Sequence, residues 1–432
     1  MSKTFRAWEV DQVWLLPPSI QDLVPAGHVA HFVRETVREG LDLREIMGSY
    51  REDRGYPPYH PGMMVALLLY AYSQGVYSSR RIARGCEERL DFAAVTGLQH
   101  PDFRTISDFR KRHLRALQGL FVQVLKLCQA AGLVKLGHVA LDGTRIKANA
   151  SKHKAMSYQR MKQAEQRLSA EVEGWLSQAA QADAAEDRQL GADKRGDELP
   201  DWVANKQARL DKIRAAKAAL EAEASASASQ DQSRGNDGTP PPTVPDKAQR
   251  NFTDPESRIS KTKDGFIQGY NAQAAVDSHA QVIVAQGLTN EGNDQAQLVP
   301  MVKAIRTNTG RNPDELSADA GYCSAANLRD LARRRINAYV ATGRQRHGTA
   351  AAVADRKYRP GIVARMATKL KRGGHRSRYR WRKQVVEPVF GHIKQARGFR
   401  QFLLRGIDKV SAEWAILCTV HNLLKLAKAC PG

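Results

Sequence analysis

The sequence predicts an α/β protein in which a mixed β-sheet is flanked by helices and preceded by an all-helical region. Three observations support this fold class. Residues 1–132 carry apolar side chains at helical spacing. From residue 133 onward, β-branched and apolar runs alternate with turn residues, as they do in strands and hairpins. After residue 290, amphipathic stretches alternate with short apolar runs, which favours helices and strands that alternate within one sheet.

The helical region contains a candidate DNA-reading unit. HPGMMVALLLYAYSQGVYSSRRIARG predicts two helices separated by a turn, with Ser78 or Ser79 capping a second helix that starts near Arg80. Arg80 and Arg81 at the start of that helix are compatible with a helix-turn-helix, and an ordinary helical pair is the equal alternative. HPDFRTISDFRKRHLRALQGLFVQVLKLCQAAGL then predicts turn residues followed by one long amphipathic helix that ends at Gly132.

The next segments predict the strands of the sheet. LGHVALDGTRIKANAS indicates a first strand up to Leu141, a turn at Asp142-Gly143 and a brief continuation. FIQGYNAQAAVDSHAQVIVAQGLTN predicts two alternating strands joined by a turn. NDQAQLVPMVKAIRTNTG predicts a helix capped by Asn293 or Asp294, and ELSADAGYCSAANLRDLARRRINAYVATG predicts strand, loop, helix and strand. The ribonuclease-H-like fold has this order of elements.

A charge-balanced segment interrupts the predicted sheet between its first two strands. Residues 152–224 predict two helices that pair antiparallel, and residues 225–245 are a low-complexity linker that is expected to be disordered. The expected organisation is a helical DNA-binding domain at 1–132, the first core strand at 133–151, a helical insertion with its linker at 152–250, and the remaining core with a basic C-terminal block at 251–432.

The positive charge of the chain is large and unevenly distributed. There are 67 Lys and Arg against 45 Asp and Glu, a formal net charge of +22. Residues 329–405 hold 22 Lys and Arg with three acids, whereas residues 151–250 hold 16 charges of each sign. A concentrated positive block attracts polyanions, of which nucleic acid is the commonest. DNA is therefore the predicted partner, and a solvated basic face is the alternative.

Composition argues against other classes of protein. The five cysteines are scattered and none has the spacing of a zinc site. The N-terminal sequence lacks the apolar core of a signal peptide. The longest apolar run, Met63–Leu69, is too short to cross a bilayer. We expect a cytoplasmic protein with reduced thiols.

Three acids are candidates for metal chemistry on phosphodiesters. Asp142 in VALDGT and Asp319 in LSADAGY follow predicted strands, so their carboxylates are expected to converge at one edge of the sheet. Phosphodiester cleavage uses such carboxylates to hold two divalent ions. Turn and helix-cap roles are the alternative for both residues. Glu387 is the only acid between Asp355 and Asp408, in a run dense with Lys and Arg, which fits a metal ligand that faces DNA.

The surroundings of Glu387 carry further predictions. Stabilisation of a helix N-terminus, or pairing with Lys383, is the alternative explanation for this acid. Lys394 follows seven residues later, two helical turns on, and so shares its face and could contact a phosphate. Pro388 disfavours helical backbone at Glu387, so a helix is expected to start or kink there. Trp381 lies between two arginines and could stack on a flipped base, although ordinary packing is favoured.

Long strings of the sequence resemble a known family. RGYPPYHPGMMVALLLYAY and HPDFRTISDFRKRH resemble the helical N-terminal region of bacterial insertion-sequence transposases of the DDE type, from the IS-four/IS-five supergroup. VALDGTRIKANASKHKAMSY resembles the first-Asp block, SADAGYCSAANL the second, and VVEPVFGHIKQARGFRQFLLRG the Glu block. The likeness covers nearly the whole chain, and the group numbered eleven eighty-two is the most similar.

This resemblance implies a catalytic function. It implies a ribonuclease-H-like core in which Asp142, Asp319 and Glu387 bind two Mg²⁺ or Mn²⁺ ions. It also implies double-stranded DNA partners, namely terminal inverted repeats and a target, which a dimer or larger assembly brings together. Cleavage of the element end releases a 3′-hydroxyl, and that hydroxyl attacks the target. The expected location is the bacterial cytoplasm, in association with the nucleoid.

The supergroup has a Tyr-Arg-Glu-Lys signature around its Glu. Tyr379, Arg382, Glu387 and Lys394 match it in order, but four residues separate Arg382 from Glu387 where the pattern has three, and Lys383 fits that spacing better. The role of Arg382 is therefore an open question. The residues expected to contact DNA are Lys394, Arg382, Lys383, Tyr379, Arg397, Arg80 and Arg81.

Other functions remain alternatives at this point. A nuclease of the same fold would hydrolyse DNA without joining it. A DNA-binding protein descended from a transposase would have lost part of the acid triad, and all three acids are present. A recombinase with a Tyr or Ser nucleophile is a weaker alternative, for which Tyr379 would be the nucleophile.

Overall fold

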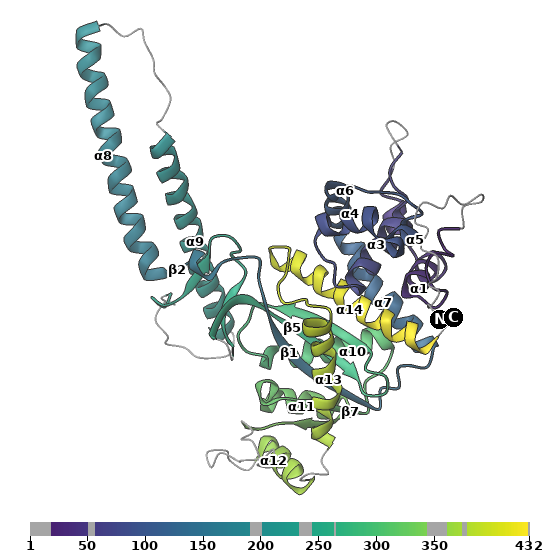
Figure 1. Cartoon of the computed structure of the whole chain (residues 1–432). Coiled ribbons are helices and arrows are strands. Elements are labelled where there is room, and N and C mark those ends of the chain that lie inside the picture. The colour runs from purple at the N-terminus through teal and green to yellow at the C-terminus, as the bar shows by residue number, and fades with distance from the viewer. Residues whose placement is uncertain are drawn as a thin grey trace, which may run out of the picture.

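The structure is a computed structural model that describes residues 19–50, 57–190, 201–232, 244–262, 265–343, 361–373 and 378–430. A central sheet lies between a helical region on one side and further helices on the other, and a two-helix arm projects away from both (Figure 1). The predicted helical N-terminal region and mixed sheet are confirmed for the described residues. Among these residues, no helix has the length and apolar character needed to cross a membrane.

The helical region consists of short helices packed around a shared core. The predicted break between two helices is confirmed, because the second helix begins at Ser79 after Ser78. The single long helix predicted further on is wrong: two helices meet at His113, whose ring packs against Phe109 and contacts the hydroxyl of Tyr50. The helices are α1 (Val29–Glu35), α2 (Arg44–Met47), α3 (Pro61–Ser73), α4 (Ser79–Glu88), α5 (Leu90–Thr96), α6 (Phe103–Arg112) and α7 (Leu114–Ala130).

The turn between α3 and α4 docks on a distant part of the chain. Gly75 has φ +71°, and a Cβ there would lie 2.7 Å from the backbone oxygen of Arg397. The hydroxyl of Tyr77 donates to that same oxygen at 2.8 Å. Only glycine combines this backbone conformation with so close an approach. The helical region is therefore fastened to the segment that follows Glu387.

The sheet has the strand order β4-β5-β1-β7-β8, and β6 pairs with β5 as well. The pairs β1·β5, β4·β5 and β5·β6 are antiparallel, whereas β1·β7 and β7·β8 are parallel. The sheet is thus mixed, as predicted. Its strands are β1 (His138–Lys147), β4 (Arg258–Thr262), β5 (Gly265–Asp277), β6 (Ile283–Thr289), β7 (Glu315–Ala318) and β8 (Asn337–Val340).

Strand β1 corrects one sequence prediction. A turn at Asp142-Gly143 was expected, but β1 runs through both residues without a break. Strand β5 pairs with it along its length, and Asp142 is opposite Ala274 while Gly143 is opposite Gln273. Asp-Gly favours a turn only locally, and the hydrogen bonds and packing that β5 supplies outweigh that preference.

Helices cross over between the parallel strands and cover the sheet. The structure places 3₁₀ turns at Gln295–Gln297, Ala320–Tyr322 and Arg378–Arg380, and a π-helical turn at His392–Ala396. Helix α13 packs on β1, β5 and β7, and α14 packs between β6 and α7. The helices are α10 (Leu298–Thr309), α11 (Ala325–Arg333), α12 (Ile362–Gly373), α13 (Trp381–Gly391) and α14 (Ile407–Ala429).

Helix α13 continues through Pro388, so the expected helix start at Glu387 is wrong. Proline has no N–H to donate to the carbonyl four residues earlier, which here belongs to Gln384. The side-chain amide of Gln281 donates to that carbonyl instead, at 3.1 Å. A side chain from outside the helix thus satisfies the carbonyl that Pro388 cannot reach.

One continuous apolar core joins the helical region to the sheet, and α14 lies at its centre. The indole N–H of Trp414 donates to the backbone oxygen of Gln273 on β5, at 3.0 Å. The side chain of Asn422 bonds both the N–H and the C=O of Ile283 at 2.8 Å, and so pairs backbone groups of β6. Polar groups that the core buries are therefore hydrogen-bonded at these positions.

The arm consists of α8 (Tyr158–Leu190) and α9 (Asp201–Gln232), which pack against each other above a small sheet of β2 (Ala155–Ser157) and β3 (Gln249–Asn251) (Figure 1). Ion pairs link the helices, among them Lys206 with Glu171 at 2.7 Å. The disorder expected at 225–245 is wrong for 225–232, which form the end of α9, because alanine favours helix. Residues 233–243 lie outside the described residues.

Glu413 on α14 is completely buried and accepts hydrogen bonds from the backbone N–H groups of Leu403 and Leu404. Burial raises its pKa to about 7, although Arg110 opposes the shift. The folded protein therefore holds this proton more tightly than the unfolded chain does. The stability that the protonated carboxyl contributes is complete below an unfolded-state pKa of about 4.5 and is lost as pH rises through about 7.

We expect Glu413→Gln to remove this pH dependence. Between pH 4.5 and 7.5 the unfolding free energy of the wild type should fall, relative to the variant, by up to about 3 kcal/mol, because one pKa unit corresponds to about 1.4 kcal/mol. Urea unfolding at both pH values measures this free energy, and Glu88→Gln, at an exposed position, is the control. Parallel pH profiles for wild type and Glu413→Gln would contradict the prediction.

Candidate active site

Two of the predicted acids lie side by side because of the register between β1 and β7. The parallel pairing ends at Leu141 opposite Ala318, so Asp142 and Asp319 are the next residues of neighbouring strands. Neighbours in register point to the same face of a sheet. Asp142 was expected at the end of its strand. It lies within β1 instead, at the point where the neighbouring strand β7 stops. We call Asp142 and Asp319 the acid pair.

The acid pair is an unfavourable concentration of negative charge. Burial raises the pKa of Asp142 to about 6, Arg382 opposes that shift, and the charge of Asp319 adds to it. Burial also raises the pKa of Asp319, where Arg382 again opposes and Asp294 adds. Acids that share a partly buried site disfavour each other's ionised form, and a cation between them relieves the repulsion.

Arg382 supplies positive charge to this site in the structure. Its Nη1 donates to Oδ2 of Asp142, and the two side chains are only 10 % and 16 % exposed. Its Nε is buried and has no hydrogen-bond partner among the described residues. Arg382 thus faces the acid pair, whereas Lys383, which fits the spacing of the signature better, is exposed.

Asp294 belongs to this site, although the sequence predicted that it caps a helix. Its side chain caps no helix, and Asn293 accepts from the backbone of Gln295 instead. Oδ1 of Asp294 accepts hydrogen bonds from the side-chain amides of Asn271 and Gln273. Those two amides could have signalled it, because they occupy alternate positions in the buried part of β5.

The absence of a side chain at Gly143 makes room for this arrangement. A Cβ at Gly143 would lie 2.5 Å from Nε2 of Gln273 and 2.8 Å from Oδ1 of Asn271. The side-chain amides of Asn271 and Gln273 therefore pass over β1 at Gly143 and reach Asp294 there. Asp-Gly at this position is a packing requirement of the site and does not form a turn.

Glu387 lies on the same helix as Arg382 but on another face of it. The residue is exposed on α13, five positions after Arg382, which is about 140° around the helix from the face that meets Asp142. Within the described residues, no hydrogen bond or ion pair joins Glu387 to Lys383 or to any other side chain. Its charge is also not among those that shift the pKa of Asp142.

Lys394 lies in the π-helical turn after α13 and contacts β1 at the residues that follow Gly143. Its Nζ donates to Oγ1 of Thr144 at 2.5 Å and to the backbone oxygen of Arg145 at 2.8 Å. Burial lowers its pKa. Thr144 is two residues beyond Asp142 on the same strand, so both side chains point to one face.

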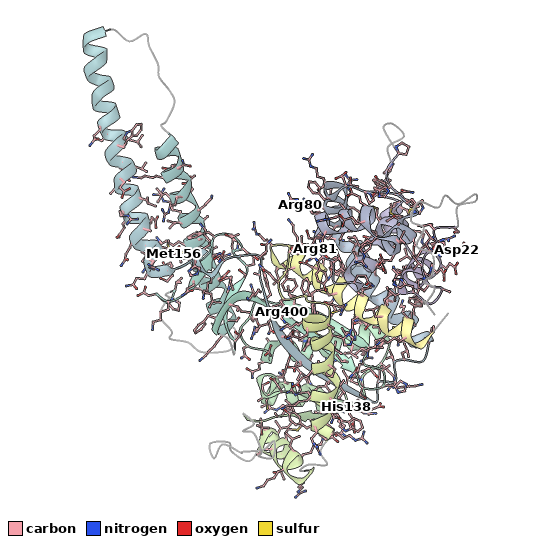
Figure 2. The ribbon with its side chains drawn as sticks, viewed as in Figure 1. Asp22, Arg80, Arg81, His138, Met156 and Arg400 are labelled. Carbon is pink, nitrogen blue, oxygen red and sulfur yellow. The ribbon has the colours of Figure 1, made fainter. Side chains whose placement is uncertain are left out.

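The other residues expected to contact DNA differ in how far their side chains are exposed to solvent. Arg80 and Arg81 are exposed at the start of α4, on the surface of the helical region (Figure 2). Tyr379 and Arg397, for which contact with DNA was also expected, are buried, with 6 % and 8 % exposure. The backbone oxygen of Arg397 is the one that the turn at Gly75 approaches.

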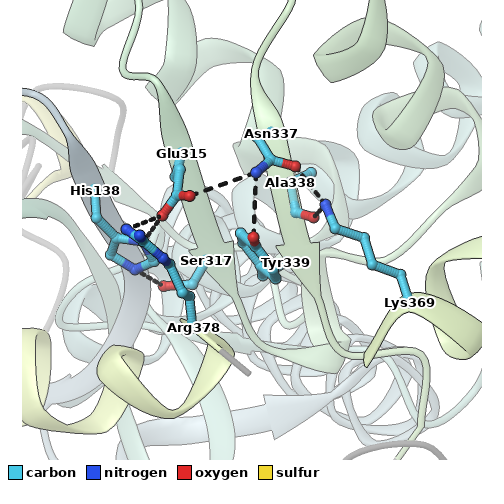
Figure 3. A network of polar contacts seen from close by, with 8 residues as sticks. All are labelled: His138, Glu315, Ser317, Asn337, Ala338, Tyr339, Lys369 and Arg378. Carbon is cyan, nitrogen blue, oxygen red and sulfur yellow. Dashed lines mark hydrogen bonds and ion pairs between the residues drawn. The ribbon is translucent and has the colours of Figure 1, made fainter. Parts of the chain in front are cut away.

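A polar network at the opposite end of β1 and β7 anchors the start of α13 (Figure 3). His138 contacts Oγ of Ser317 at 2.9 Å and Glu315 at 3.2 Å, and Arg378 pairs with Glu315 at 3.1 Å. The Trp381 ring meets the His138 ring edge-on. Ser317 and His138 are both buried, so these Ser-His-Glu contacts join the two strands inside the fold. The network extends to Asn337, Tyr339 and Lys369.

The chemistry of these acids fits a hard divalent cation. Mg²⁺ prefers carboxylate oxygens, and the pKa of Asp142 is raised by burial and by the neighbouring charge of Asp319, although Arg382 opposes the shift. Within the described parts of the chain, no three His, Cys, Asp or Glu side chains are arranged to hold one ion. The donors Asp142 and Asp319 thus fit such an ion in kind, while Arg382 occupies an oxygen of the pair in this structure.

Two parts of the chain match models of known protein families. Residues 236–423 match the family described as Transposase DDE domain, and residues 18–112 match the one described as Transposase domain (DUF772). Both matches support a DNA transposase. The transposase DDE match includes Asp319 and Glu387 and begins after Asp142. Searches of curated proteins and of solved structures found no match.

The transposase DDE domain implies a ribonuclease-H-like fold, and the mixed sheet of the described residues agrees with it. The second transposase match coincides with the helical region, from residue 18 to the end of α6. The two matches together cover more than half of the chain, and they leave out residues 113–235, which include α7, β1 and both helices of the arm.

Proposed function

We propose that this chain is the transposase of a bacterial insertion sequence and that it cuts and joins DNA at the acid pair. The observation that carries the proposal is the convergence of Asp142 and Asp319, beside Arg382 and Lys394, in a chain that matches transposase domains. The IS-four/IS-five supergroup, and within it the group numbered eleven eighty-two, is the proposed relationship, based on the sequence blocks around the three acids.

The proposed reaction has two displacements at phosphorus. In the first, water attacks the phosphodiester at the element end; its P–O3′ bond breaks, and a 3′-hydroxyl and a 5′-phosphate remain. In the second, that hydroxyl attacks a target phosphodiester, forms a new P–O bond and expels a target 3′-hydroxyl, so one bond replaces another. Neither step requires a covalent protein–DNA intermediate.

The chain contributes position and charge to this reaction. Asp142 and Asp319 would hold Mg²⁺ or Mn²⁺, with Glu387 as the third proposed ligand, and two such ions supply stabilisation of the attacking and leaving oxygens. Lys394 is placed to bind a phosphate oxygen next to the acid pair. Arg382 balances the negative charge of Asp142 in the free protein. Preorganised charges of this kind are the main contribution a protein makes to phosphoryl transfer.

The proposed DNA partners are the two terminal inverted repeats and a target duplex. Exposed Arg80 and Arg81 on α4, together with Lys383 on α13, are the proposed contacts to duplex phosphates. Because two ends must be processed together, we propose a dimer or larger assembly on DNA. The proposed location is the bacterial nucleoid, where these partners are found.

A strand-transfer assay tests this function. The substrate is an end-labelled fragment that carries the gene with its flanking genomic DNA, and the target is a supercoiled plasmid. With Mg²⁺ or Mn²⁺, we expect cleavage at the borders of inverted repeats and covalent joining of labelled ends to the plasmid, and neither product in EDTA. Cleavage without joining would indicate a nuclease instead, and a trapped phosphotyrosine adduct would indicate a recombinase.

A further inference from the structure

A cleft of about 640 Å³ lies further along β1 than Asp142, between the end of β1, the start of β5 and the segment after α13. We call it the Phe266 cleft. None of the described residues that line it is acidic, and five are cationic. Figure 2 shows Arg400, one of the five, at the centre of the molecule. The cations are Arg145, Lys147, Lys152, Lys394 and Arg400.

Among the described residues, no ion pair includes any of the five cationic side chains of the cleft. Arg145 donates to the backbone oxygens of Glu291 and Gly292, and Arg400 donates to the side-chain oxygen of Gln395. Bonds to neutral oxygens orient these guanidinium groups but leave their charge uncompensated. A cluster of oriented, uncompensated cations binds phosphates.

Phe266 places an aromatic ring among these charges. Its side chain is 59 % exposed, which is unusual for a large apolar group within a cationic cleft. Other exposed rings are covered by arginines: Arg378 lies 5.2 Å from the Trp381 ring, and Arg80 lies 5.0 Å from the Phe103 ring. Within the part of the chain that the structure describes, no cation or ring lies over Phe266. Its face is available to a planar ligand.

The combination of cations and one exposed aromatic face favours single-stranded over double-stranded nucleic acid. In a duplex, the base faces are stacked on each other, so a ring cannot reach them. An unpaired nucleotide exposes its base face, and stacking on aromatic side chains is how single strands are bound without sequence preference. The volume of the cleft is in the range of small-ligand pockets, which suits a few nucleotides but not a double helix.

We propose that the Phe266 cleft binds unpaired nucleotides of the DNA strand that is processed at the acid pair, with phosphates on its cations and one base on Phe266. This inference rests on the proposed function and extends it by assigning the path of the strand. Lys394 connects the two sites, because it lines the cleft and also bonds Thr144, two residues from Asp142. The strand thus leaves the acid pair along the end of β1.

Binding of a single strand in EDTA tests the aromatic contact without any catalytic step. The probes are fluorescein-labelled (dT)₁₅ and a 15-base-pair duplex, followed by anisotropy with the full-length protein. We expect Phe266→Leu to weaken (dT)₁₅ binding about 5- to 30-fold, as loss of one stacked base does, and to change duplex binding less than twofold. Leu90→Ala, which shortens an exposed apolar side chain outside the cleft, is the control and should leave both affinities unchanged.

The salt dependence tests the cationic contacts. For (dT)₁₅, we expect the double variant Lys147→Gln/Arg400→Gln to reduce the slope of log affinity against log salt by roughly 1.4, since each phosphate contact on a single strand contributes about 0.7. The control is Arg365→Gln/Arg372→Gln, which removes two exposed charges from α12. A slope change that is equal in both double variants would overturn the assignment of the phosphate contacts to the cleft.

The aromatic assignment is overturned if Phe266→Leu binds (dT)₁₅ like the wild type, or if iododeoxyuridine in the strand cross-links to Trp381 and not to Phe266. These outcomes are separable from failure of the proposed function. If the wild type joins DNA but Phe266→Leu retains full single-strand affinity, only the cleft assignment fails. If single-strand binding depends on Phe266 but no cleavage or joining occurs, the cleft stands and the transposase proposal fails.

Discussion

Asp319→Asn is expected to lower cleavage and strand transfer by at least about a thousand-fold. Divalent ions held by the acid pair would contribute several kcal/mol to the displacement, and each 1.4 kcal/mol or so is a factor of ten. Asn keeps the size of the side chain and can still accept from the backbone N–H of Gly321, as Asp319 does at 2.9 Å. The change therefore removes charge with little loss of local structure.

Stability provides the internal check on Asp319→Asn. The pKa of Asp319 is raised by burial and by Asp294, so its ionised form is unfavourable in the folded protein. Removing the charge should leave the melting temperature unchanged or raise it, while activity falls. Asp314→Asn, an exposed acid just before the same strand, is the control and should retain both properties. Full activity in Asp319→Asn would show that the acid pair does not carry the reaction.

Glu387→Gln is expected to produce a comparable loss of strand transfer without loss of stability. Glu387 is exposed and makes no ion pair within the described residues, so its replacement should change the unfolding free energy by no more than about 0.5 kcal/mol. A thousand-fold fall in joining would then report a role in the reaction and not a folding defect. Urea unfolding and the strand-transfer assay, run on one preparation, measure both quantities.

The control for Glu387→Gln is Asp408→Asn, which removes one exposed negative charge just after the basic segment 329–405. It should join DNA like the wild type. If Glu387→Gln joins DNA normally and Asp294→Asn does not, the third carboxylate of the proposed site is Asp294 and not Glu387. That result is plausible on geometry, because the charge of Asp294 already acts on both members of the acid pair.

The sequence by itself determined the features that depend on short-range pattern. Helical spacing predicted the helical region, and the break before α4 follows from the Gly-Val-Tyr-Ser-Ser turn between two periodic stretches. The blocks around Asp142 and Asp319 predicted that these acids belong to one sheet edge. Their side-by-side placement then required only a parallel pairing of the two strands, which the alternation of helices and strands had already favoured.

Tertiary structure decided where polar side chains go, because their partners come from distant parts of the chain. Asp142 meets Arg382 from 240 residues away, and Asp294 turns from a helix cap toward amides on β5. Pairing with β5 likewise carried β1 straight through an Asp-Gly sequence that locally favours a turn. The hydrophobic periodicity of a segment predicts which of its faces is apolar. Which charged side chains come into contact depends on the register between strands and on the packing of α13 against the sheet. For that reason the acid pair was predictable from sequence, whereas the positions of Asp294, Arg382 and Glu387 were not.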